Sequence, residues 1–217
     1  MDTLTNEEIR EAGLADWRKL AQALYARFRT PDYSAGAAFA TAVSGVVEAE
    51  NQHLEVRLAP GLVDVIVGTR QDGLWVTGRD ITLAQQISQI ARDSGLAAEP
   101  TAVTQLEIAL DTAHEDRIGP FWAALLTGDP SNKVHDAVLD PTGSVPAMWF
   151  QPTDEHETPR QRWHFDLWLA PEVADERIAT AVSAGGTVVD DSWAPSFTVL
   201  ADPDGNRVCV CTPLDRA

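Results

Sequence analysis

The stretch EAENQHLEVRLAPGLVDVIVGTRQDGLWVTGRD, residues 48–80, decides the fold of the first half of the chain. A polar cluster, residues 52–55, follows an apolar helical run and precedes two segments whose apolar residues alternate as they do in strands. Arg70 ends the second of these segments, and Asp80 begins the next helix. We therefore expect side chains far apart in the sequence to converge beside His53 and to form a small polar site.

Hydrophobic periodicity predicts the elements around this stretch. Residues 16–28 have helical or mixed spacing, and their last part also fits a strand. The segment 97–101, which contains Pro100, is the candidate linker to the second half. The other elements predicted in the first half are a short helix from the capping box at Thr5, an amphipathic helix over residues 34–51, strands over 56–58 and 63–67, and a helix over 80–94 with Gly95 as its C-cap.

The charge balance excludes some classes of partner. The 217 residues include 33 acidic and 16 basic ones, spread along the chain, which give a net charge of −17. Contact with phosphate needs clustered Lys and Arg, so we expect neither nucleic acid nor an anionic membrane as a partner. The first residues lack the pattern of a signal peptide, and no apolar run reaches transmembrane length. We therefore expect a cytoplasmic protein in which Cys209 and Cys211 are reduced.

The stretch 48–80 resembles the core pattern of the pterin-4a-carbinolamine dehydratases, also called 4a-hydroxytetrahydrobiopterin dehydratases. That pattern is an acidic residue, His-His-Pro, a strand pair, Thr-His, and a Gly-Leu-Thr segment leading to Asp. The matching positions are Glu48 for the acidic residue, Gln52 and His53 for the two histidines, Leu54 for the proline, Thr69-Arg70 for Thr-His, and Gly73-Leu74, Thr77 and Asp80 for the last part. The resemblance extends over roughly residues 4–97.

Two of the three family histidines are replaced, which bears on catalysis. Dehydration of a 4a-hydroxytetrahydropterin needs one group to protonate the leaving hydroxyl and another to take a ring N–H proton, and histidines suit both roles. Gln52 cannot exchange a proton at neutral pH, and Arg70 stays protonated. The resemblance implies His53, Gln52, Arg70 and Asp80 as catalytic residues, and Glu48 and Trp75 as ligand-binding residues. Two interpretations stay open: a hydro-lyase in which His53 still acts as acid or base, and a degenerate module without turnover that serves oligomerisation or binds a ligand such as a pterin-like heterocycle.

The second half repeats one order of elements, a strand, a helix and further strands. The repeats comprise residues 103–110, 117–126, 134–139 and 147–150, and then residues 163–169, 172–184, 187–189, 196–200 and 207–211. Three phrases carry a second resemblance: FWAALLTG at 121–128, RWHFDL at 162–167 and ADPDGN at 201–206. They make roughly residues 102–213 similar to a glyoxalase-like domain of the vicinal oxygen chelate superfamily. This resemblance implies two βαβββ modules around a cleft.

Metal-dependent members of that superfamily take ligands from the first and last strands of each module. The corresponding candidates are Gln105 or Glu107, Gln151, His164 and Cys209. This set has one histidine and no secure carboxylate, so we expect no metal and no other cofactor. Of the possible metals, zinc on His164 and Cys209 would fit these residues best. His164 then has Asp166 or a backbone group as its partner. Five tryptophans in this half favour a flat aromatic or apolar ligand: Trp122, Trp149, Trp163, Trp168 and Trp193.

The sequence thus predicts a two-domain α+β protein, with a dehydratase-like domain over residues 1–98 and a glyoxalase-like domain over residues 102–217. The first has an antiparallel sheet with helices on one face. The function expected is dehydration or binding of a pterin-like heterocycle. The alternatives are a protein that sequesters a small molecule through Trp163, His164 and Trp193, and a metal-assisted lyase or dioxygenase centred on His164. A small-molecule ligand and self-association into a homo-oligomer are the expected interactions.

Overall fold

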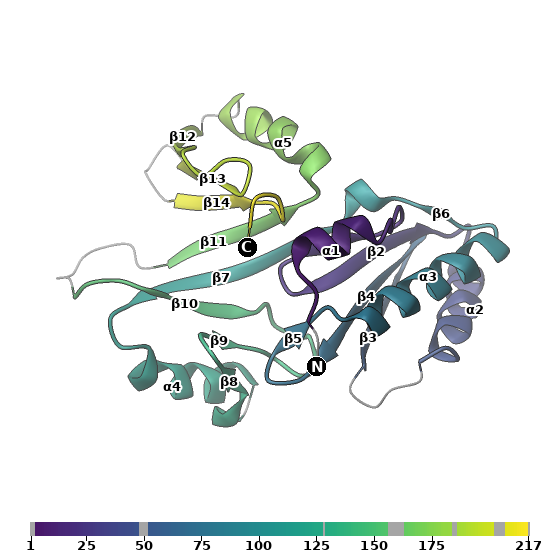
Figure 1. Ribbon diagram of the computed structural model, residues 1–217, viewed down its shortest axis with the longest axis horizontal. Helices are drawn as coiled ribbons and strands as arrows, with labels where there is room; N and C mark the ends of the chain where they lie inside the picture. Colours follow the sequence, from purple (N-terminus) through teal and green to yellow (C-terminus); the bar gives the residue numbers. More distant parts are fainter. Residues whose placement is uncertain are drawn as a thin grey trace. The chain divides into compact units, whose positions relative to one another are not determined.

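The chain divides into two compact units (Figure 1). The computed structural model describes residues 3–47, 52–127, 129–155, 163–183, 186–201 and 207–216. Unit 1 comprises Met1–Thr104 together with Pro213–Ala217, and unit 2 comprises Gln105–Thr212. Both contain helices and a sheet, which confirms the predicted α+β class. The domain limits 1–98 and 102–217 stay a prediction.

Unit 1 is built on an antiparallel sheet of order β1-β2-β4-β3, in which β5 pairs with β4 and β6 pairs with β2. Its strands are β1 Arg18–Leu20, β2 Ala23–Arg29, β3 Gln52–Ala59, β4 Leu62–Arg70, β5 Leu74–Trp75 and β6 Ala97–Ala98. Its helices are α1 Asn6–Glu11, α2 Tyr33–Ser44, α3 Gly78–Asp93 and the 3-10 turn η1 Pro100–Ala102. The capping box predicted at Thr5 begins α1.

Alternation along β4 decides which face of this sheet is covered. Val63, Val65 and Val67 are fully buried in one core with residues of α2 and α3. The residues between them, among them Asp64, point to the other face, where Arg27 of β2 binds Asp64 through Nε at 2.6 Å. The sheet therefore has an apolar face toward the helices and a charged face away from them.

Three sequence predictions in unit 1 are wrong in detail. The polar cluster 52–55 begins strand β3 instead of ending a helix, since α2 stops at Ser44 and its cap is Gly45. Within residues 16–28 the helical interpretation is wrong and the strand alternative for the last part is confirmed: β1 and β2 form there, because Leu24, Ala26 and Phe28 are buried at a spacing of two. The candidate linker 97–101 contributes β6, which pairs with Phe28 and Arg29.

Unit 2 contains the two predicted βαβββ modules, joined in one sheet of order β12-β13-β14-β11-β7-β10-β9-β8. The first module comprises β7 Thr104–Thr112, α4 Glu115–Thr127, the 3-10 turn η2 Pro130–Asn132, β8 Lys133–Val134, β9 Ala137–Val138 and β10 Met148–Pro152. The second comprises β11 Trp163–Leu169, α5 Pro171–Ser183, β12 Thr187–Asp190, β13 Phe197–Ala201 and β14 Arg207–Cys211. Within each module the first and last strands pair in parallel, β7 with β10 and β11 with β14.

The helices of unit 2 cover one face of this sheet. Leu110 and Phe150 pack with residues of α4, and Leu169 and Val210 pack with residues of α5. The residues that alternate with them on β7, β10, β11 and β14 point to the opposite face. That face carries the polar side chains described below: Glu107, Asp111, Gln151, His164, Asp166 and Cys209. Among the helices that the structure describes, none combines the length and the apolar character needed to cross a membrane.

Candidate functional site

Two polar clusters occupy strands that the sequence singles out, one in each unit. In unit 1, His53 lies at the start of β3 and is the register partner of Gly68 on β4. Arg70, at the end of β4, points to the same face as Gly68, and its Nε donates a hydrogen bond to His53 Nδ1 at 3.2 Å. The structure therefore brings His53 and Arg70 together on the charged face of the sheet.

The surroundings of His53 favour its neutral form. Burial lowers the pKa of His53 below its ordinary value of 6.5, the charge of Arg70 lowers it further, and Glu55 acts in the opposite direction. Because Nδ1 accepts from Arg70, the ring proton of neutral His53 lies on Nε2, which is 3.9 Å from Glu55 Oε2. The nitrogen lone pair that a general base needs is thus already engaged by a permanent cation.

Asp80 belongs to a different group of residues, on the helix face of the same sheet. Its side chain is fully buried at the start of α3, and its Oδ2 accepts hydrogen bonds from Thr77 N, Thr77 Oγ1 and Thr69 Oγ1, each at 2.8 Å. The other carboxylate oxygen, Oδ1, has no hydrogen-bond partner among the described residues. This geometry ties the start of α3 to the end of β4.

The four residues predicted to converge are therefore divided between two faces. Gln52 is the register partner of Thr69, and its Nε2 donates to the Arg79 carbonyl at 3.4 Å, so it lies with Asp80. The expectation of one site is corrected because consecutive strand residues point to opposite faces, which separates Gln52 from His53 and Thr69 from Arg70. Glu48 lies outside the described residues. The catalytic roles of Gln52, His53, Arg70 and Asp80 stay a proposal.

Trp75, predicted as a ligand residue, is 40% exposed at the edge of unit 1. Its indole Nε1 donates to the Gln71 carbonyl at 3.1 Å and closes the turn between β4 and β5. Glu55, which belongs to the predicted polar cluster 52–55 but was not given a catalytic or ligand role, joins His53 on the charged face. A spacing of two along a strand is the signal that could have identified it.

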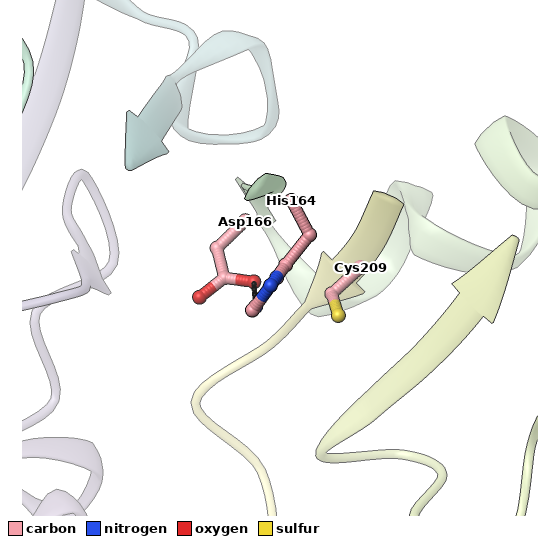
Figure 2. Close-up of side chains that lie close together, drawn as sticks. All are labelled: His164, Asp166 and Cys209. Carbon is pink, nitrogen blue, oxygen red and sulfur yellow. Dashed lines mark ion pairs between the residues drawn. The ribbon is translucent and has the colours of Figure 1, made fainter. Parts of the chain in front are cut away.

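In unit 2, His164, Asp166 and Cys209 form a compact cluster (Figure 2). Asp166 and Cys209 are register partners on β11 and β14, and His164 precedes Asp166 by two residues on the same face. One nitrogen, one oxygen and one sulfur from these side chains lie within 4.8 Å of one another. His164 and Cys209 were predicted candidates, and their proximity follows from the parallel pairing of the two strands.

Indole groups hold the carboxylates of this face in place. Trp149 Nε1 donates to Asp166 Oδ2 and Trp168 Nε1 donates to Glu107 Oε2, both at 2.8 Å. Asp166 and Glu107 are only 7% and 3% exposed. Trp149 reaches Asp166 across β7, where its own register partner is the small, buried Ala109. Trp149 and Trp168 therefore serve mainly as hydrogen-bond donors to buried carboxylates. The role of an aromatic surface for a ligand fits them less well.

Asp111, which lies beside His164 of this cluster, is a residue that sequence reasoning missed. Its Oδ1 lies 3.3 Å from His164 Nδ1. This oxygen atom is buried and has no hydrogen-bond partner among the described residues. A single Asp near the end of a strand gives no signal in the sequence, since its role depends on β7 and β11 being neighbours in the sheet.

The remaining candidates of unit 2 are separated from this cluster to different degrees. Trp163 points to the helix face, where it packs edge-on against Trp122 at 5.2 Å between ring centroids, so the expectation that it accompanies His164 is wrong. Trp193 is 63% exposed and stacks on Phe197 at 6.0 Å. Gln105 stands six residues before Asp111 on β7, which puts it about 20 Å away along the strand. Gln151 is the register partner of Asp111, on the next strand.

Comparisons with known proteins agree with this division. Residues 2–90 match the family model described as pterin 4 alpha carbinolamine dehydratase, and residues 107–211 match the model described as glyoxalase-like domain. A search of the curated proteins found no significant match.

Two solved structures show partial similarity. A transcriptional coactivator/pterin dehydratase from Brucella melitensis is 30% identical over 42% of this chain and 99% of its own, with a TM-score of 0.38. An NAD-dependent benzaldehyde dehydrogenase from Legionella pneumophila is 13% identical over 49% of this chain and 97% of its own, with a TM-score of 0.36. Both TM-scores are below 0.5, so the assignment rests on the family models. The chain thus belongs, through its N-terminal part, to the pterin 4 alpha carbinolamine dehydratase family, and a glyoxalase-like domain is fused to that part.

Proposed function

We propose that unit 1 binds a pterin-like heterocycle and does not dehydrate it at the rate that three histidines would give. The observation that supports this proposal is the hydrogen bond from Arg70 Nε to His53 Nδ1. This hydrogen bond engages the basic nitrogen of His53. The lowered pKa of His53 keeps the imidazole neutral at pH 7. A neutral imidazole whose remaining proton lies on Nε2 is a hydrogen-bond donor and a poor acid.

The same residues suit binding. The pyrimidine edge of a pterin offers an amino group and ring N–H groups as donors and a carbonyl oxygen as acceptor. Glu55 supplies a carboxylate, and Arg70 supplies fixed N–H donors next to His53. Gln52, an amide on the other face, has no proton to exchange at neutral pH. The charged face is thus equipped to orient a polar ring and poorly equipped to move its protons.

The proposal is tested with two measurements on the full-length protein. Titration of a tetrahydropterin, followed by tryptophan fluorescence and calorimetry, is expected to show saturable binding that Arg70→Gln weakens. In the second measurement, the loss of 4a-hydroxytetrahydropterin is expected to proceed at the uncatalysed rate, with no change in His53→Ala. Acceleration that disappears in His53→Ala would instead establish a dehydratase, and the absence of binding to any pterin would remove the proposal.

A gain-of-function variant sharpens this test. Arg70→His restores a histidine at a family position on the face of His53, releases His53 Nδ1 and is expected to raise the dehydration rate about 10²-fold or more. The matched control is Gln71→His, which also adds one imidazole and leaves Arg70 in place. Equal rates in the two variants would show that Arg70 does not limit the chemistry. Self-association and a cytoplasmic location stay predictions.

A further inference from the structure

We propose that Cys209 of unit 2 is a nucleophile for which His164 is the base and Asp111 the positioning residue, and that it adds to an apolar α,β-unsaturated carbonyl compound. This site goes beyond the function proposed for unit 1 and does not depend on it. A thiol, a base and an electrophilic reactant are all that the addition requires.

The imidazole of His164 is arranged as a base. Its Nδ1 faces Asp111 Oδ1 at 3.3 Å, and that oxygen is buried and has no hydrogen-bond partner among the described residues. A proton on Nδ1 lets the imidazole donate toward Asp111 and leaves on Nε2 the lone pair that a base needs. Asp111 therefore positions His164, as the third group of a nucleophile–base arrangement does.

The thiol of Cys209 lies within reach of this base. Cys209 and Asp166 are register partners on β14 and β11, and His164 lies two residues before Asp166 on the same face. One His164 nitrogen, one Asp166 carboxylate oxygen and Cys209 Sγ lie within 4.8 Å of one another (Figure 2). Contacts between a nucleophile and its base are often longer before a reactant binds. Cys209 is only half-buried and is not in a disulfide, so a small reactant can approach its sulfur.

The charges around this thiol favour transfer of its proton to His164 as the new bond forms. His164 Nε2 lies 3.6 Å from Asp166 Oδ1, so Asp111 and Asp166 stabilise the imidazolium from its two nitrogens. Asp166 also disfavours a thiolate before the reactant arrives, because like charges repel. Arg207 lies two residues before Cys209 on the same strand face and offsets part of the negative charge that develops on the sulfur.

The place of Cys209 in the sheet selects the kind of reaction. β14 lies between β11 and β13, so the backbone N–H groups around Cys209 belong to a sheet interior and form no oxyanion hole. Acyl transfer depends on such donors, whereas conjugate addition places no oxyanion beside the sulfur. In the addition, Sγ forms a bond to the β-carbon and the C=C π bond breaks. Its electron pair moves to the α-carbon, which takes from His164 the proton that the thiol gave up.

Apolar side chains beside the thiol favour an apolar reactant. On β13, Val199 is the register partner of Cys209 and Phe197 is that of Cys211. Register partners point to the same face, so Val199 and Phe197 lie on the face of the two thiols. Trp193 stacks on Phe197 with ring centroids 6.0 Å apart. A flat apolar group attached to the carbonyl therefore lies against Val199 and Phe197 while the double bond meets Sγ.

Alkylation of Cys209 by two acrylamides tests the proposal. The full-length protein, in buffer with EDTA at pH 7, reacts with N-phenylacrylamide or acrylamide, and tandem mass spectrometry of its peptides gives the rate at each cysteine. We expect Cys209 to react with N-phenylacrylamide about 10²-fold faster than glutathione does. The advantage over glutathione should be smaller with acrylamide, and an equal one would contradict the apolar preference. His164→Gln should remove most of the advantage, because the thiol loses its base.

Matched variants separate activation from access to solvent. His114→Gln removes an imidazole of unit 2 outside this cluster, and Cys211→Ser removes the neighbouring, buried thiol. Both should leave the rate at Cys209 unchanged, and circular dichroism confirms that each variant is folded. The proposal is overturned if Cys209 of the folded wild-type protein reacts no faster than glutathione, or if its rate persists in His164→Gln.

The role of Asp111 has its own spectroscopic signature. Asp111→Asn should lower the rate at Cys209 about 10-fold or more, because the amide can donate to Nδ1 and place the ring proton of His164 on Nε2. Long-range ¹H–¹⁵N NMR spectra distinguish the two tautomers. A lowered rate with the His164 tautomer unchanged would contradict the positioning role.

Discussion

The charge of His53 is set by its neighbours, and its effect on stability has a definite sign. In the unfolded chain its pKa returns to about 6.5, and in the folded protein the pKa is lower because of burial and Arg70. Between these two values the unfolded chain binds more protons than the folded one, so the free energy of unfolding falls as pH is lowered through this window. Above about pH 7.5 the penalty is absent, because both states are neutral.

We therefore expect urea denaturation between about pH 7.5 and 5.5 to show a decrease in stability that is smaller in His53→Gln. In an NMR titration, the His53 midpoint should lie below 6.5 and should rise in Arg70→Gln. Arg10→Gln, on the exposed surface of α1, is the control that should leave the midpoint in place. An unchanged midpoint in Arg70→Gln would mean that burial alone sets the pKa.

The sequence shows which residues are candidates for the sites. It predicts only part of the contacts that these residues make. Gln52, His53 and Arg70 stand out because they replace or keep a histidine in a family pattern. The separation of Gln52 from His53 needed the knowledge that both belong to one strand. Asp111 could not be found at all, because only the packing of β7 beside β11 brings it to His164.

At the scale of single elements, α3 depends on the buried carboxylate at its start. Asp80 accepts three hydrogen bonds from Thr69 and Thr77, and these donors have no access to water. We expect Asp80→Ala to lower the free energy of unfolding by about 2–4 kcal/mol, through the lost cap and the unsatisfied buried donors. Urea denaturation followed by circular dichroism measures the change.

The matched control lies at the other end of the same helix. Asp93 is exposed and accepts from Gln89 Nε2 at 2.7 Å, so Asp93→Ala should change stability by less than about 0.5 kcal/mol. Similar losses in Asp80→Ala and Asp93→Ala would show that the buried network contributes nothing specific.

Elements whose pattern is locally consistent were predicted well, and those stabilised by distant partners were not. The helix over 80–94 has an apolar stripe, a start signal and Gly95 at its end, and it is found as α3. Residues 16–28 carry Trp17, Leu20, Leu24 and Phe28 at three- and four-residue intervals, which imitates a helix. These residues form strands because β2 pairs with β4, which lies almost forty residues later in the chain.

For the whole molecule, separate cores predict separate unfolding transitions. Among the residues that the structure describes, a core cluster that includes Val65 lies in unit 1, and clusters that include Phe150 and Leu169 lie in unit 2. We expect calorimetry to show two transitions, with Val65→Ala lowering one and Leu169→Ala lowering the other. One transition that responds to both substitutions would show that the units unfold together.

The assignment of Pro213–Ala217 to unit 1 has a consequence for biosynthesis. Asn6 Nδ2 donates to the Arg216 carbonyl at 3.4 Å, so segments that precede and follow unit 2 in the sequence meet in unit 1. A ribosome makes the chain from the N-terminus, and domains fold as they emerge. Unit 1 therefore cannot make its contacts with residues 213–216 until the whole of unit 2 has been synthesised.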